Sequence, residues 1–157
     1  MKSEKMFKSP YSRFAAMVAT STVVMFGLMY LNTYQWNHIY FSETRVYMAI
    51  LMGASMAGIM LGYMLSMYNS RKINIGIFVG SIGVFVLSLW LVRSQVTVGD
   101  ISWMKAMIPH HSIAIMTSER ANLSDPRVQD LAQSIITTQY REINEMKMLI
   151  QDLEGQS

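Results

Sequence analysis

The sequence of 157 residues contains no cysteine. Disulfides, cysteine-based zinc sites, iron–sulfur clusters and thiol catalysis are therefore excluded. Charge is scarce as well, because 15% of the residues are charged, whereas an average soluble protein has about 25%. This shortage, together with 52% hydrophobic residues, indicates a chain that enters a lipid bilayer. Methionine, by contrast, is abundant, with 16 residues.

Three long stretches of the chain lack any charged side chain, namely residues 14–34, 46–68 and 73–92. About 20 apolar residues in a helix cross a hydrocarbon core about 30 Å thick. Backbone polar groups inside lipid have to bond internally, so each stretch is predicted to be a transmembrane helix. The sequence thus predicts a membrane domain at residues 1–93 and a polar domain at residues 94–157.

The orientation in the membrane follows from the basic residues near the helix ends. Residues 1–13 carry four Lys or Arg side chains and the turn at 69–72 carries two. The loop between the first two stretches has only Arg45, which lies close to Glu43 in the sequence. We therefore expect a cytoplasmic N-terminus in a bacterial inner membrane and a periplasmic, extracytoplasmic location for residues 94–157.

The second apolar stretch has a methionine at every fourth position, and small residues lie on its opposite side. A ladder of thioethers that passes a soft cation is one interpretation of these methionines. Flexible apolar side chains that face lipid or the first stretch are the favoured one. The small residues predict a close hairpin with the third stretch. The methionines are Met48, Met52, Met56, Met60 and Met64. The small residues are Ala54, Gly58 and Gly62 in the second stretch, and Gly76 and Gly80 in the third.

The polar domain is predicted to form two helices joined by a short turn. The first is expected from Asp100 to about Asn122, and the second from Pro126 to about Leu153. Asp125 is a suitable N-cap, and Pro126 fits the first helical position because its missing N–H has no helical partner there. The composition of residues 94–157, with five basic and eight acidic side chains, argues against binding to nucleic acid.

Folding the two helices into an antiparallel hairpin gathers a set of metal-binding side chains on one seam. The predicted apolar stripe of the second helix consists of Val128, Leu131, Ala132, Ile135, Met146, Leu149 and Leu153. Gln139 and Glu142 interrupt this stripe, where a polar group without a partner is costly. The His110–His111 pair of the first helix comes level with them, directly after Pro109. The predicted seam residues are Met104, Met107, His110, His111, Gln139, Glu142 and Met146.

This set allows two interpretations. A His pair facing a Glu is often a structural polar layer that fixes helix register. Alternatively, the set binds a metal: imidazole suits copper, zinc, iron and nickel, and thioether selects monovalent copper, so the mixture favours a copper ion. A di-iron site would need a Glu-x-x-His pattern, which neither helix has. His38, in the loop before the second stretch, is either an accessory ligand or, more typically for a loop histidine, solvated.

The motifs of the two helices resemble the ferritin-like family known as domain of unknown function 305 (DUF305). Residues 104–114 read Met-x-x-Met-Ile-Pro-His-His-x-x-Ala, residues 131–135 read Leu-Ala-x-x-Ile, and residues 139–146 read Gln-x-x-Glu-Ile-x-x-Met. The resemblance implies a four-helix bundle and, as in some members, extracytoplasmic copper binding by the Met and His residues. Many members have a further Met at the position of Thr117, whereas this chain has Met116.

The expected fold class is all-α, with three transmembrane helices followed by an extracytoplasmic helical hairpin. A hairpin of this size has too small a core to be stable alone, so we expect a homo-oligomer, most simply a dimer that forms a four-helix bundle. Packing onto the membrane domain is the alternative. The expected function is copper binding and homeostasis. An interaction or assembly module and a metalloenzyme are the competing hypotheses, and no catalytic residue is assigned.

Overall fold

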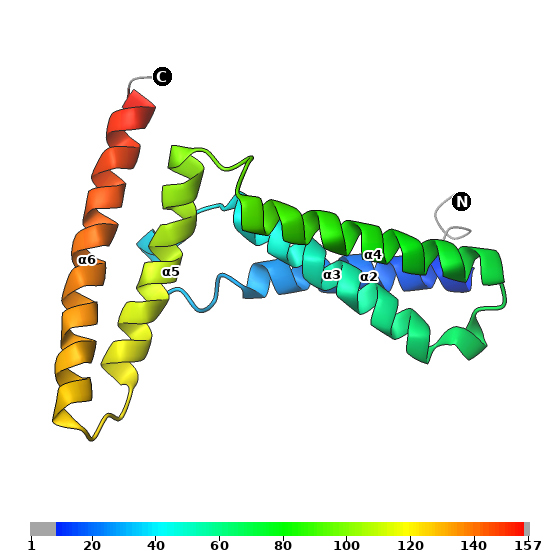
Figure 1. The fold of residues 1–157 in the computed structure, drawn as a ribbon, viewed down its shortest axis with the longest axis horizontal. Coiled ribbons are helices and arrows are strands. Elements are labelled where there is room, and N and C mark those ends of the chain that lie inside the picture. The colour runs from blue at the N-terminus through cyan, green and yellow to red at the C-terminus, as the bar shows by residue number, and fades with distance from the viewer. Residues whose placement is uncertain (1–8, 156–157) are drawn as a thin grey trace. The chain divides into compact units, whose positions relative to one another are not determined.

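A computed structural model describes residues 9–155, and within this range the chain is all-helical and has no strand (Figure 1). The predicted all-α fold class is confirmed for these residues. Five α-helices and two short 3-10 helices follow one another: α2 (Pro10–Leu28), η1 (Trp36–His38), α3 (Glu43–Tyr63), η2 (Leu65–Met67), α4 (Arg71–Ser94), α5 (Asp100–Arg120) and α6 (Pro126–Gly155).

The described residues form two compact units. The first contains the chain up to Leu28 and residues 44–97, and therefore holds α2, α3 and α4. The second contains residues 29–43 and the chain from Val98 onward, and therefore holds the α5–α6 hairpin. Nothing in the sequence pattern indicated that residues 29–43 belong with the hairpin.

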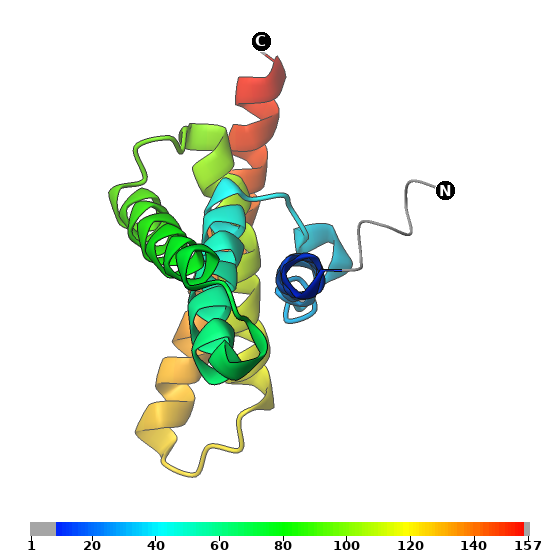
Figure 2. The ribbon, with the colours of Figure 1, turned by 90° about the vertical axis from the view of Figure 1, so that its right-hand side faces the viewer.

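The first unit has three helices that are long and apolar enough to cross a membrane, α2, α3 and α4. Figure 2 views α2 almost along its axis and separates it from the other two. The three helices agree in number with the predicted apolar stretches, but their bounds differ. Most notably, α2 ends at Leu28 rather than at residue 34, because the following residues belong to the second unit.

Aromatic and amide side chains hold one end of the first unit together. Tyr68 is buried, and its ring packs at 5.6 Å on that of Phe14 and at 5.0 Å on that of Tyr11, measured between centroids. Asn74 donates from Nδ2 to the Tyr68 carbonyl (2.9 Å) and accepts a hydrogen bond from the Tyr11 hydroxyl (2.9 Å). These contacts join α2, α4 and the segment after η2, and they satisfy a buried amide.

The glycines act only in part as the sequence predicted. Gly58 and Gly62 of α3 do face α4, since a Cβ there would lie 3.9 Å from Ser81 and Phe78 respectively. A Cβ at Gly76 or Gly80 would meet nothing within 4 Å, so these residues do not bring α4 close to α3. The close approach occurs at Gly53 of α3, where a Cβ would collide with the hydroxyl of Thr22 on α2 and lie 3.3 Å from its Cβ. Rotation of the Thr22 side chain cannot relieve a contact with its own Cβ. Gly53 is therefore the residue that permits close packing.

Replacement of Gly53 tests this assignment. Because Gly53→Ala and Gly80→Ala gain the same helix propensity, their difference isolates the collision with Thr22. We expect Gly53→Ala to be less stable than Gly80→Ala by about 1–3 kcal/mol, the usual effect of overpacking. Thermal unfolding in detergent, followed by circular dichroism, measures the difference. Equal stability of the two variants would contradict the assignment.

In the second unit, α5 and α6 run antiparallel and side by side (Figures 1 and 2). The predicted cap of α6 is confirmed: Asp125 Oδ1 accepts the Arg127 N–H at 2.9 Å, and the helix begins at Pro126. Helix α5 continues through Pro109 without interruption. The buried core of the hairpin consists of Met104, Ile108, Ile115, Ile143, Met146 and Ile150.

The buried stripe of α6 differs from the predicted one. Ile143 is fully buried, whereas Leu131 and Leu149, which the apolar pattern placed in the core, are 59% and 46% exposed. The reason is the segment 29–43, whose Tyr34 and Tyr40 pack against the hairpin core. Helix α6 thus has one apolar side that is covered by α5 and this segment, and a second that remains exposed.

Candidate functional site

The predicted seam residues all lie in the hairpin but differ in burial. Met104 and Met146 are part of the core, at 5% and 7% exposure. His110 is exposed to solvent. The remaining four are partly buried, namely Met107, His111, Gln139 and Glu142.

The structure brings His111, Gln139 and Glu142 together from the two helices. His111 Nδ1 lies 3.2 Å from Glu142 Oε2, and the two side chains are 15% and 36% exposed. The angle between the two side chains does not allow a hydrogen bond. The buried Nδ1 atom of His111 therefore has no hydrogen-bond partner. Gln139 Nε2 donates to the same carboxylate oxygen at 3.5 Å. A polar cluster of imidazole, carboxylate and amide therefore lies on the seam.

His110 is adjacent to this cluster but does not join it. Its ring centroid is 6.2 Å from that of His111, and the ring planes are inclined at 61°. Because successive residues of a helix are rotated by about 100°, the two rings leave α5 in different directions. His110 is thus placed for a ligand or partner outside the hairpin.

Burial lowers the pKa of His111, and the neighbouring His110 acts in the same direction, while the Glu142 carboxylate acts in the opposite direction. A histidine with a lowered pKa is neutral at pH 7. Neutral imidazole is the form that binds metals, since a protonated ring nitrogen has no lone pair to offer. The protonation state of His111 therefore suits a ligand.

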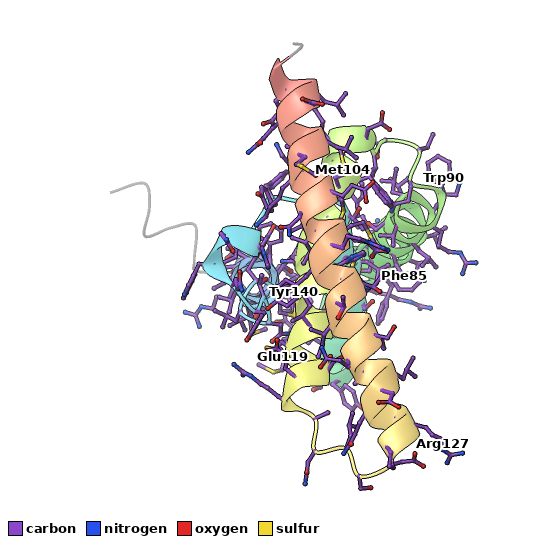
Figure 3. The ribbon with its side chains drawn as sticks, turned by 90° about the vertical axis from the view of Figure 1, so that its left-hand side faces the viewer. Phe85, Trp90, Met104, Glu119, Arg127 and Tyr140 are labelled. Carbon is purple, nitrogen blue, oxygen red and sulfur yellow. The ribbon has the colours of Figure 1, made fainter. Side chains whose placement is uncertain are left out.

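The described part of the chain, residues 9–155, contains no group of three or more His, Cys, Asp or Glu side chains positioned to hold a metal ion. Hard oxygen and nitrogen donors alone do not form a site within one hairpin. A metal at the seam has to use methionine sulfur or donors from a second molecule. Figure 3 shows Met104, one of these methionines, beside α6 near the C-terminal half of that helix.

His38 is buried, so the expectation of a solvated loop histidine is wrong. The ring is 3% exposed, and its Nδ1 is hydrogen-bonded to Ser112 Oγ at 2.9 Å. Ser112 Oγ also accepts the backbone N–H of Tyr34 at 3.1 Å. Burial lowers the pKa of His38, and the Lys147 charge adds to this effect. The only sequence signal was a small polar residue, Ser112, one helical turn from the core position Ile108.

The fold and the seam define a class of protein: three membrane-compatible helices joined to a helical hairpin that carries imidazole, carboxylate, amide and thioether groups on one seam. The sequence profile described as "Domain of unknown function (DUF305)" matches residues 91–156, which contain all of α5 and α6. The chain belongs to this family.

A similar protein is the uncharacterized protein L153 of Acanthamoeba polyphaga mimivirus, which is 33% identical over 106 residues. The match covers 63% of this chain and 70% of that protein. The matched region is longer than the hairpin domain, so the similarity extends into the part of the chain that precedes this domain. No solved structure matches the chain.

The two buried histidines predict a pH-dependent stability. Both have a lowered pKa in the folded protein, whereas an unfolded histidine takes up its proton near pH 6.5. The unfolded chain therefore binds more protons at acidic pH. We expect the unfolding free energy to be highest above about pH 6.5 and to fall as the pH drops toward the folded pKa values.

Melting temperatures of the metal-free protein in detergent, taken from pH 7.5 down to about pH 5, measure this dependence. The double variant His38→Gln/His111→Gln is expected to lose most of the decrease between about pH 6.5 and 5, and each single variant part of it. A decrease of the same size in the wild type and the double variant would refute this origin.

Proposed function

We propose that the protein is a membrane-anchored, extracytoplasmic metal-binding protein and that its metal is copper. The observation that carries the proposal is the placement of His111 against Glu142, 3.2 Å apart, on a seam lined by Met104, Met107 and Met146. Thioether and neutral imidazole together select monovalent copper among the common metals. With no cysteine in the chain, thioethers are its only soft donors.

In this proposal the side chains have distinct roles. His111 binds the ion through a ring nitrogen from the seam, His110 is an imidazole ligand on the exposed flank of the seam, and the seam methionines Met104, Met107 and Met146 supply sulfur. Glu142 and Gln139 either bind the ion or hold the His111 ring in position, as carboxylates beside metal-bound histidines commonly do. In this proposal the site serves storage, buffering or resistance.

The proposed location is a bacterial inner membrane, with the N-terminus in the cytoplasm and the hairpin in the periplasm. The support is the distribution of charge: Arg71 and Lys72 begin α4, whereas the start of α3 has one basic residue, Arg45, beside the acidic Glu43. Basic residues are retained on the cytoplasmic side.

The second candidate function is an interaction or assembly module in which the His111–Glu142 contact is purely structural. Exposed apolar side chains on the hairpin favour it, since Trp103 and Leu131 are 49% and 59% exposed. The two candidates differ in one respect: the stability of an interaction module does not depend on metal.

Copper binding by the full-length protein in detergent tests the proposal. Competition with a chromophoric Cu(I) chelator should show an affinity loss of about tenfold or more for His110→Ala/His111→Ala. Met107→Leu should also weaken binding. Met148→Leu is the matched control, because Met148 is 62% exposed and lies outside the seam.

Circular dichroism establishes that each variant stays helical. Unchanged copper affinity in the double histidine variant would overturn the copper proposal. A melting temperature that falls in that variant by the same amount with and without copper would instead support the interaction module.

A further inference from the structure

The segment 29–43 covers one side of the α5–α6 hairpin. Tyr34 and His38 both bond to Ser112, and the Arg120 guanidinium lies 5.9 Å from the centre of the Tyr34 ring. The nearby Glu119 carboxylate raises the pKa of the Tyr34 hydroxyl. In Figure 3, Glu119 and Tyr140 lie on the side of the hairpin where this segment runs. That side is therefore closed to another pair of helices.

The opposite side of the hairpin is open. Nine residues of helix turn through about 900°, which is half a turn beyond two full rotations. Trp103 lies nine residues before Ser112, and Leu131 and Leu149 each lie nine residues from Tyr140, so all three point away from the segment 29–43. We call these residues, with Val128, the open face; their exposed fractions are 49% for Trp103, 59% for Leu131, 46% for Leu149 and 43% for Val128.

The polar cluster is on the same open side. His110 lies two residues before Ser112 and is rotated by about 160° from it, which gives its ring the direction of the open face. Glu142 is 36% exposed. The open face thus has one imidazole and one carboxylate among large apolar side chains. A hollow of about 540 Å³ lies at the Trp103 end of this face, lined by Trp103, Met104, Leu149 and neighbouring residues.

We propose that a second copy of this chain packs on the open face and that the two copies share one metal site. This inference rests on the proposed copper binding and adds the face, the partner and the partner's ligands. A two-fold axis that runs parallel to the seam places α5 of each copy against α6 of the partner subunit. His110 of each copy then lies opposite Glu142 of the partner subunit. The contact pairs an imidazole, which can donate a hydrogen bond, with a carboxylate acceptor, and it occurs twice, as a symmetric interface requires.

The incomplete donor set supports a second copy rather than a different protein. One copy holds no group of three His, Cys, Asp or Glu side chains within residues 9–155. The symmetric pair supplies four histidines and two glutamates from the same seam positions. The segment 29–43 decides the geometry, because it covers the Ser112 side of the hairpin, whereas the face that carries His110 is exposed.

The first experiment measures the mass of the detergent-solubilised full-length protein by analytical ultracentrifugation, with and without Cu(I). The wild type is expected to be a dimer. Leu131→Glu/Leu149→Glu places charges on the open face and should give a monomer whose copper affinity is at least tenfold lower. Gln133→Glu/Gln151→Glu adds the same charge at exposed positions outside this face and should remain dimeric. A monomeric wild type, or a dimeric Leu131→Glu/Leu149→Glu variant, would overturn the proposal.

A second measurement does not disturb the interface. Because the chain has no cysteine, Thr138→Cys on the open side and Gln133→Cys on the far side of α6 each carry a single spin label. The distance between the labels of two copies should be shorter at 138 than at 133, and the reverse order would refute the open face. A dimer with this order that binds no copper in any variant would overturn the proposed function and keep the interface.

Discussion

The arrangement of the second unit depends on one buried hydroxyl. Ser112 Oγ receives the backbone N–H of Tyr34 and pairs with His38 Nδ1, so a single α5 side chain fixes two points of the segment 29–43. A buried polar group without these partners would destabilise the fold by about 1–3 kcal/mol. These hydrogen bonds attach the segment 29–43 to α5. Tyr34 and Tyr40 of the segment therefore pack against the hairpin core.

This attachment determines which side of the hairpin is left for function. With the segment on the Ser112 side, the core closes around Ile108, Ile143 and Ile150, and the seam residues His111 and Glu142 lie at its border. A border position is a useful compromise for a metal ligand. It is buried enough to keep the His111 ring neutral, since burial lowers its pKa, and open enough for an ion or a second molecule to reach it.

The first unit shows the same dependence on particular contacts rather than on residue type. Glycine is frequent in α3 and α4, but the close approach occurs at Gly53 against Thr22, while Gly76 and Gly80 face open space. Small residues permit close packing in lipid, but they do not select which pair of helices uses it. That selection depends on the Tyr11–Asn74–Tyr68 contacts, which position α2 against α4.

The sequence alone determined the local elements. Runs without charge specify three apolar helices, Asp125 and Pro126 specify the start of α6, and the spacing of His111 and Glu142 brings them level in a hairpin. These features depend on periodicity and capping, which act over a few residues. Only the tertiary structure decided that residues 29–43 join the hairpin, that His38 is buried, and that α6 uses Ile143 rather than Leu149 for its core. The reason is that α6 is apolar on two sides, and the side that is buried depends on the segment 29–43. That segment docks on Ser112 of α5, 74 and 78 residues from its own bonding groups, and no local pattern records such a contact.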